Sequence, residues 1–186
     1  GVQGLADVFF KLGIAFDSEA ARKINVEIFE TIYFGALTKS CELAKLCGPY
    51  EKFAGSPLSR GIFQFDMWNV QPSGRYDWNT LRKNIMTYGV RNSLLTSLMP
   101  TATSASVMGY NECFEPITSN IFVRQTLAGN HIIINSYLVN DLIKLGLWNK
   151  EVKDTIIANN GSIQNIEGIP NNIKAIYKTV WEIKQS

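Results

Sequence analysis

Charged residues are scarce in this sequence and are not grouped by sign. The 186 residues include 18 Lys and Arg and 16 Asp and Glu, a formal net charge of +2 at pH 7. The basic residues are scattered instead of forming runs, which argues against a nucleic-acid or membrane-surface partner. No apolar stretch approaches the ~20 residues that span a bilayer, and Asp7 and Lys11 interrupt the first apolar run. We therefore expect no nucleic-acid partner, no signal peptide and no membrane.

Cysteine occurs three times and histidine once. Cys41, Cys47 and Cys113 are an odd set without Cys-x-x-Cys or another metal-ligand spacing. If Cys41 and Cys47 share one helix, their Cα atoms lie about 9 Å apart, beyond the roughly 7 Å limit of a disulfide. A reducing, cytoplasmic compartment is the simpler interpretation. With His131 alone, a multi-histidine metal site is excluded.

Internal repeats, low-complexity tracts and linkers are also missing, although 46% of the residues are apolar. We predict one segment over residues 1–186 with no internal domain boundary. The chain opens on GVQGLADVFF without Met and closes on the amphipathic YKTVWEIKQS. Both ends suggest a piece of a longer protein.

Periodicity predicts several helices and few strands. The expected helices cover 2–12, 18–47, 78–88, a short segment from near Thr101, 136–145, 149–159 and 171–184. The expected extended segments cover 62–65, 91–100, 117–127 and 131–134, the last two joined by a tight turn at 128–130. Helices interleaved with strands favour an α/β fold.

A hydroxyl-rich turn, TATS at 101–104, follows a predicted strand and Pro100 and opens a short helix. A helix N-terminus offers unpaired N–H groups and a partial positive charge, and Thr101, Thr103 and Ser104 would add hydroxyl donors. Such a turn can hold a phosphate without any lysine. Ser and Thr are also ordinary helix caps, so the residues alone leave both interpretations open.

The stretch NECFE places Asn111, Cys113 and Glu115 at alternating positions. In an extended backbone this pattern would set a thiol between two polar side chains, as radical or nucleophile chemistry needs. Pro116 and the turn residues that follow it argue against a regular strand.

The remaining polar and aromatic candidates favour structural roles. His131 begins an apolar run and is interpreted as a strand-end structural residue. Arg91 and Arg124 flank predicted strands and could reach an anion, although surface or ion-paired arginine is the usual case. We expect core or domain contacts for the four tryptophans, which are Trp68, Trp78, Trp148 and Trp181.

The chain contains the stretches GVQGLADVF, IFETIYFGAL, GPYEKFAGSPLSRGIFQFDMW, YGVRNSLL, MPTATSA, FEPITSNIFVRQTLAG, GLWN, NGSIQ and YKTVWEI. These stretches resemble the large subunit of eukaryotic-type class I ribonucleotide reductase. They follow one another in order over essentially the whole chain. The resemblance implies an internal segment from the later part of the ten-stranded α/β barrel, helix-rich and incomplete.

The resemblance also implies an activity and a site. Members of this family reduce ribonucleoside diphosphates by a thiyl radical, and the substrate diphosphate is held by the turn that corresponds to Thr101, Ala102, Thr103 and Ser104. The family's radical cysteine lies in an Asn-x-Cys-x-Glu motif well before the GVQGLADVF segment. Cys113 is therefore interpreted as a coincidental echo, and no catalytic residue is expected in this segment.

Partners and cofactors are implied for the parent enzyme only. They are the small (beta) subunit with its diiron-generated radical, a second large subunit in a homodimer, thioredoxin or glutaredoxin as reductant, and the nucleotide effectors ATP, dATP and other dNTPs. Because the radical and redox cysteines of the family lie outside this segment, we expect residues 1–186 alone to be inactive.

Two other functions remain open. The segment could serve as scaffold and interaction surface without ligand affinity of its own. A cysteine hydrolase built on Cys113 and His131 would need those two side chains in contact.

Overall fold

The computed structural model describes residues 1–127 and 129–184. The chain divides into two compact units. The first unit comprises Gly1–Arg22 with Leu98–Ser186, and the second comprises Lys23–Ser97. This division concerns packing within the chain, and the prediction of one segment without a domain boundary stays a prediction.

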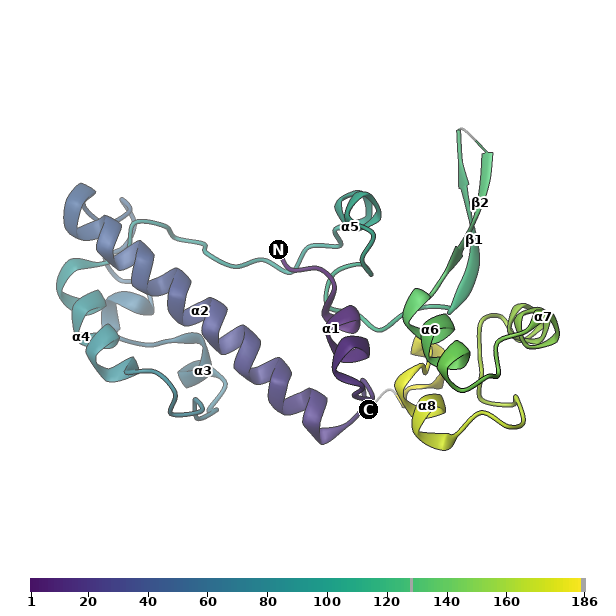
Figure 1. The fold of residues 1–186 in the computed structure, drawn as a ribbon. Helices are drawn as coiled ribbons and strands as arrows, with labels where there is room; N and C mark the ends of the chain where they lie inside the picture. The colour runs from purple at the N-terminus through teal and green to yellow at the C-terminus, as the bar shows by residue number, and fades with distance from the viewer. Residues whose placement is uncertain (128, 185–186) are drawn as a thin grey trace. The chain divides into compact units, whose positions relative to one another are not determined.

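Helices make up most of the regular structure, and a single hairpin supplies the strands described (Figure 1). The first unit contains α1 (Leu5–Leu12), α5 (Ala102–Met108), β1 (Ile121–Thr126), β2 (Gly129–Ile134), α6 (Ser136–Lys144), α7 (Lys150–Ala158), α8 (Asn171–Ile176) and the 3-10 helix η2 (Val180–Glu182). The second unit contains most of α2 (Glu19–Cys47), then η1 (Leu58–Arg60), α3 (Gln64–Met67) and α4 (Trp78–Tyr88).

Capping residues fix the helix boundaries that the sequence predicts. The Oγ of Ser18 accepts a hydrogen bond from the N–H of Ala21 at 3.1 Å before α2. Asp77 Oδ1 accepts from Thr80 N–H at 2.9 Å before α4, and Gly89 follows that helix with φ +77°. Such caps satisfy backbone groups that the helix leaves unpaired. Both helices are therefore confirmed.

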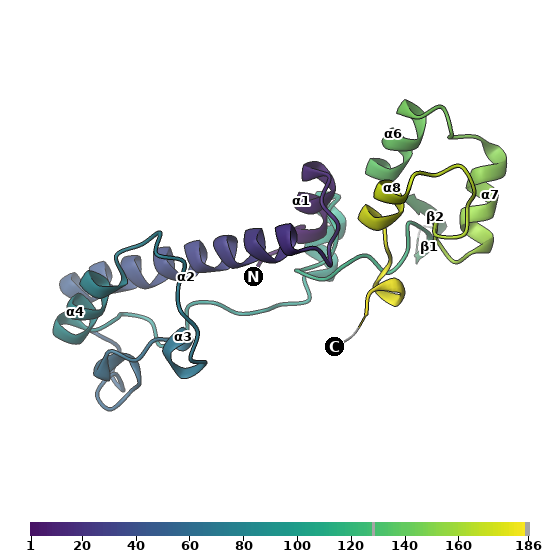
Figure 2. The same ribbon diagram turned by 90° about the horizontal axis from the view of Figure 1, so that it is seen from below.

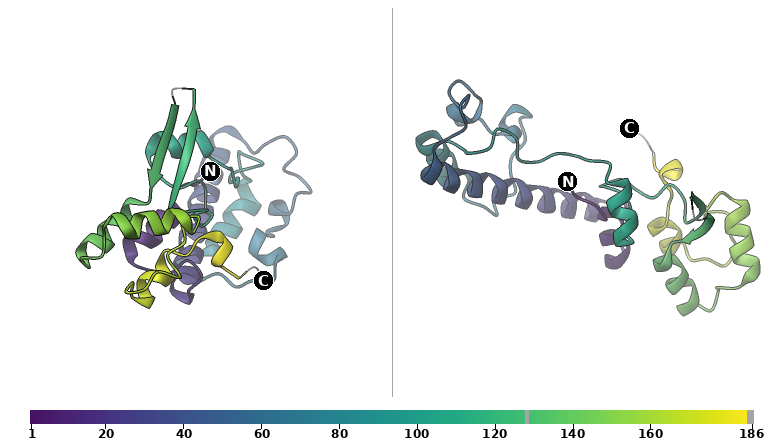
Figure 3. Two further views of the ribbon diagram at one scale, coloured as in Figure 1. Left: turned by 90° about the vertical axis from the view of Figure 1, so that its right-hand side faces the viewer. Right: turned by 90° about the horizontal axis from the view of Figure 1, so that it is seen from above.

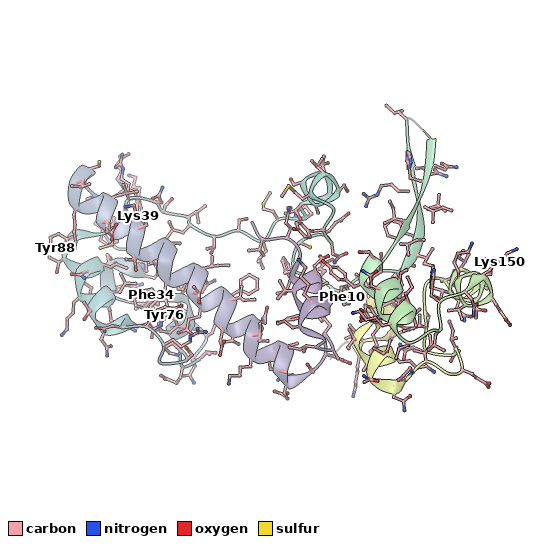
Figure 4. The ribbon with its side chains drawn as sticks, viewed as in Figure 1. Phe10, Phe34, Lys39, Tyr76, Tyr88 and Lys150 are labelled. Atoms are coloured by element: carbon pink, nitrogen blue, oxygen red, sulfur yellow. The ribbon has the colours of Figure 1, made fainter. Side chains whose placement is uncertain are left out.

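The core of the second unit is aromatic. Trp78 is buried, and its ring centroid lies 5.1 Å from that of Phe34 and 4.8 Å from that of Phe65. Its Nε1 donates to Glu30 Oε1 at 3.0 Å, so the polar edge of the indole is satisfied. Phe34 also stacks on Tyr76 with centroids 4.5 Å apart, and the two rings lie side by side in Figure 4.

The core of the first unit is aliphatic and lies among α6, α7, α8 and the start of the hairpin (Figure 2). Its buried members are Ile121, Leu138, Leu142, Ile156, Ile163, Ile166, Ile169 and Tyr177. Phe10 of α1 stacks on Tyr177 with centroids 5.1 Å apart. The Tyr177 hydroxyl donates to Asp141 Oδ2 at 2.7 Å. Burial raises the pKa of Tyr177, and the Asp141 carboxylate raises it further.

The hairpin confirms the two extended runs predicted around a turn. β1 and β2 pair antiparallel, from Ile121 opposite Ile134 to Thr126 opposite Gly129. The hairpin extends away from α6, α7 and α8 (Figure 1, Figure 3). Of the predicted turn at 128–130, Ala128 lies outside the described residues.

A buried asparagine joins the base of the hairpin to the helical layer. The Nδ2 of Asn120 donates to the carbonyl oxygens of Gly161 and Tyr177, each at 2.9 Å. Its Oδ1 accepts from Asn135 Nδ2 at 3.0 Å. Gly161 has φ +85°, and a Cβ there would lie 2.7 Å from the Asn120 nitrogen. The close approach therefore requires glycine at this position.

The extended piece predicted at 62–65 is wrong. The segment enters α3 at Gln64, and Asp66 Oδ2 accepts from the N–H of Phe63 at 2.7 Å. Arg82 holds the same carboxylate through Nη1 at 2.7 Å. This bond lowers the pKa of Asp66 and keeps the capping group charged. The carboxylate thus selects a helix start where the aromatic alternation suggested a strand.

The strand predicted at 91–100 is also absent from the described structure. These residues form no ladder, and the one sheet described is the β1–β2 hairpin. Leu95 packs against the second unit's core, whereas Leu94 is 87% exposed. A strand requires a ladder of hydrogen bonds to a second strand, and among the described residues the one sheet contains only β1 and β2.

The last predicted helix, 171–184, is shorter than expected. α8 ends at Ile176, because the Tyr177 carbonyl bonds to Asn120 and the N–H of Val180 turns to the Ile117 carbonyl at 2.8 Å. A 3-10 turn follows. Trp181 is 83% exposed there and Trp68 is 66% exposed, so neither is a core residue; the other alternative, a contact with another domain, stays a prediction for these two. The core contacts of Trp78 and Trp148 are confirmed.

Replacing Asn120 by alanine should lower the free energy of unfolding by about 2–4 kcal/mol, because two buried carbonyls and one amide lose their partner. The measurement is urea unfolding followed by the fluorescence of Trp148. Asn172→Ala, which changes an exposed asparagine of α8, should stay within about 0.5 kcal/mol. Equal stability of the two variants would contradict the role given to Asn120.

Candidate functional site

The hydroxyl-rich turn lies at the start of α5, as predicted. Thr101 precedes the helix with φ +50° and ψ +20°, a left-handed conformation that a β-branched residue seldom adopts. Its Oγ1 accepts from the backbone N–H of Cys113 at 2.8 Å. Its carbonyl accepts from the N–H of Ala105, also at 2.8 Å. The two bonds hold Thr101 in this conformation.

The first amides of α5 face solvent. The N–H groups of Ala102, Thr103 and Ser104 have no intrahelical acceptor, as at every helix start. The side chain of Thr101 does not cap them, because its oxygen accepts from Cys113 instead. All three residues are exposed, while Ala105 is fully buried and anchors the helix. The turn therefore presents N–H groups and two hydroxyls that suit an anion.

A cationic side chain contacts the same helix. Nη1 of Arg124, from β1, donates to Ser106 Oγ at 2.6 Å. Nη2 lies 4.0 Å from Glu112 Oε1, a long ion pair. Ser106 in turn donates to the Ala102 carbonyl at 2.8 Å. Arg124 thus links the hairpin to the first turn of α5 and places positive charge beside it.

The Asn111–Cys113–Glu115 pattern does not form an extended segment. Cys113 has φ +39° and is buried. Asn111 Nδ2 donates across the turn to the Glu115 carbonyl at 3.0 Å. The alternation that would present a thiol between two polar side chains is absent, and Cys113 contributes its backbone N–H to Thr101.

The other candidate residues do not gather at this turn. His131 stands opposite Arg124 in the hairpin and is exposed. In the described part of the chain no hydrogen bond joins it to Cys113. Arg91 donates to the Pro49 carbonyl at 3.5 Å in the second unit. The three cysteines are free thiols.

Residues 1–127 and 129–184 contain no group of three or more His, Cys, Asp or Glu side chains placed to hold a metal ion. None of their helices combines the length and apolar character needed to cross a membrane.

Comparison with known proteins identifies the family. The model of the ribonucleotide reductase barrel domain matches residues 1–186. The chain belongs to this family. Relatives include the ribonucleoside-diphosphate reductase large chain of Neurospora crassa, 58% identical over 100% of this chain and 20% of the relative. The large subunit of Dictyostelium discoideum is 59% identical over 100% of this chain and 21% of the relative.

A solved structure supports the same family assignment. The alpha subunit of the Actinobacillus ureae class Id ribonucleotide reductase superposes with a TM-score of 0.66 at 28% identity, covering 96% of this chain and 26% of that one. The chain spans about a fifth of the length of the curated relatives it matches. The prediction of a helix-rich, incomplete part of the reductase α/β barrel is therefore confirmed.

Two contacts that hold the hydroxyl-rich turn were not predicted from the sequence. The bond from Arg124 to Ser106 joins residues 18 apart, and Asp7 bonds to the N–H of Asn111 across 104 residues. Arg124 was noted as a possible anion contact, without its partner. For Asp7 the one signal was a carboxylate inside an apolar run.

Replacing Thr101 by valine keeps the branched shape and removes the acceptor for the Cys113 N–H. We expect a loss of about 1–2 kcal/mol in the free energy of unfolding and faster hydrogen exchange of the Cys113 amide. Thr101→Ser should preserve the protection of that amide. Thr118→Val, at an exposed threonine of the same unit, should change neither quantity. The same Cys113 exchange rate in the Val and Ser variants would refute the contact.

Proposed function

We propose that this chain works as part of a large catalytic subunit that reduces ribonucleoside diphosphates to deoxyribonucleoside diphosphates by thiyl-radical chemistry, for DNA synthesis. The observation that carries the proposal is the match along the whole chain to proteins named ribonucleoside-diphosphate reductase, at 51–59% identity. Many separated stretches contribute to that match.

Within this function the segment holds the substrate diphosphate at Thr101, Ala102, Thr103 and Ser104. The exposed N–H groups and hydroxyls of the turn are donors, and diphosphate oxygens are charged acceptors. Hydrogen bonds to charged groups contribute more than neutral ones, roughly 1.5–3 kcal/mol each. Arg124 adds positive charge at the first turn of the helix through Ser106. The nucleoside and the reacting ribose are left to other parts of the subunit.

The proposal extends to the surroundings of the parent enzyme. The large subunit would pair with a second copy and with a small subunit that supplies the radical from a diiron site. Thioredoxin or glutaredoxin would restore its cysteines, and ATP, dATP and other dNTPs would bind as allosteric effectors. A cytoplasmic location fits the three free thiols.

Alanine substitution of the turn separates substrate binding from a scaffold role. In a full-length large subunit carrying this segment, Thr103→Ala with Ser104→Ala should weaken CDP binding by roughly 100-fold or more, because two donors to charged oxygens are lost. Calorimetric titration gives the affinity. The matched control, Thr118→Ala with Ser136→Ala, removes two exposed hydroxyls elsewhere in the first unit and should not alter it. Unchanged CDP affinity in the turn variant would favour the scaffold role.

Residues 1–186 alone should not reduce CDP, even with small subunit, reductant and ATP present. Of the three cysteines, Cys41 and Cys113 are buried and Cys47 is exposed at the end of α2, so no two of them form an exchanging pair. The measurement is chromatographic detection of dCDP, with the full-length subunit as positive control. Any dCDP formed above background would disprove this expectation.

A further inference from the structure

Asp7 is the one buried charged side chain among the described residues. It is 7% exposed, and the other buried polar side chains are Ser40, Asn120 and Thr179. Removing a carboxylate from water is unfavourable unless hydrogen bonds replace its hydration. Asp7 lies in the first turn of α1, where an exposed carboxylate would serve the helix equally well. Its burial therefore depends on particular partners.

Those partners lie far away in the sequence. Asp7 Oδ2 accepts from the backbone N–H of Asn111 at 2.8 Å. Asp7 also acts on Tyr137: burial raises the pKa of Tyr137, and the Asp7 charge raises it further. The phenol thus remains protonated. The backbone N–H of Asn111 replaces part of the hydration that the buried carboxylate has lost.

The start of α1 holds the 111–113 turn at two further points. The Gly4 N–H donates to the Asn111 carbonyl at 3.1 Å, and the Leu5 N–H donates to the Cys113 carbonyl at 3.4 Å. α1 and the segment after α5 lie side by side in the first unit (Figure 1, Figure 3). Asp7 also accepts from the Asn111 N–H, so α1 and Gly4 hold the turn through both an N–H donor and two carbonyl acceptors.

The 111–113 turn in turn fixes Thr101, because the Cys113 N–H donates to Thr101 Oγ1 at 2.8 Å. The left-handed backbone of Thr101 sets the direction in which the N–H groups of the first α5 residues point. A displacement of Cys113 would free Thr101 to relax toward a common conformation. The donors of the turn would then point elsewhere.

We propose that Asp7 is a positioning residue for the diphosphate turn, acting through the backbone of Asn111 and Cys113 on Thr101. The proposal rests on the proposed function of that turn. Asp7 touches no substrate. It keeps the turn in its binding conformation before the substrate arrives, which lowers the ordering cost of binding.

A positioning role affects the diphosphate more than the nucleoside. In the full-length subunit, Asp7→Ala should weaken CDP binding by roughly tenfold and leave cytidine binding within about twofold, both measured calorimetrically. Asp7→Asn keeps an oxygen for the Asn111 N–H and should restore most of the CDP affinity. Asp141→Ala removes a hydrogen-bonded carboxylate elsewhere in the first unit and should leave CDP affinity unchanged.

The turn variant Thr103→Ala with Ser104→Ala is measured in parallel. If it weakens CDP binding and Asp7→Ala does not, the role of Asp7 is refuted and the proposed function stands. If the turn variant binds CDP normally, both proposals fail. An equal loss of CDP and cytidine affinity in Asp7→Ala, or no recovery in Asp7→Asn, would mean that Asp7 only stabilises the fold.

Hydrogen exchange in the unsubstituted subunit gives a test that does not depend on a variant folding. Because coupling between two sites is reciprocal, CDP should slow exchange of the amides of residues 111–113 as well as those of the turn. Cytidine should do neither. Protection of the turn by CDP without any change at residues 111–113 would overturn the proposal.

Discussion

The folding of the first unit depends on the need to satisfy one buried amide. Asn120 follows the site segment and precedes the hairpin, and its side chain reaches the carbonyls of Gly161 and Tyr177. Gly161 lies just after the end of α7, and Tyr177 directly follows α8. Aliphatic side chains can pack in several arrangements, because their contacts have little directionality. A buried amide is different: its N–H and C=O groups stay unpaired unless both carbonyls lie within hydrogen-bond distance. Asn120 therefore selects one arrangement of the isoleucine-rich core.

The site is fixed by the same kind of interaction. α5 is too short to be stable by itself. Ala105 anchors one face, Ser106 bonds to Arg124 of the hairpin, and Thr101 bonds to the turn that α1 holds. Segments from the start, middle and later part of the chain thus meet at seven helical residues. The short helix can leave its first amides unpaired because its position does not depend on them.

Local chemistry predicted much of the fold. Ser18, Asp77 and Gly89 carry their own boundary signals, since a cap acts within one helical turn. The predicted boundaries failed where a distant group decided the outcome. Arg82 and Asp66 turned an aromatic run into a helix, and the Asn120 amide ended α8 after six residues of the predicted element. Residues 91–100 have the composition of a strand, but a strand also needs a second strand to form a ladder, and the sheet described contains only β1 and β2.

The candidate site was likewise predictable only in part. The hydroxyls of Thr101, Thr103 and Ser104 marked the turn in the sequence, and the family resemblance gave it a ligand. The position of Asp7 could not be predicted, because α1 has the same amphipathic pattern whether that carboxylate faces solvent or Asn111. A contact across 104 residues leaves no local periodicity.

The identity of residue 101 shows why such distant support is needed. Glycine would adopt φ +50° without strain, but it would offer no oxygen to the Cys113 N–H. Threonine supplies that oxygen. Its left-handed backbone costs roughly 1–2 kcal/mol, while the hydrogen bond stabilises the conformation by about 1 kcal/mol. The two contributions nearly cancel, so local interactions alone do not select this conformation. The groups that hold Cys113 decide the balance, and the conformation of the turn is therefore set by residues outside it.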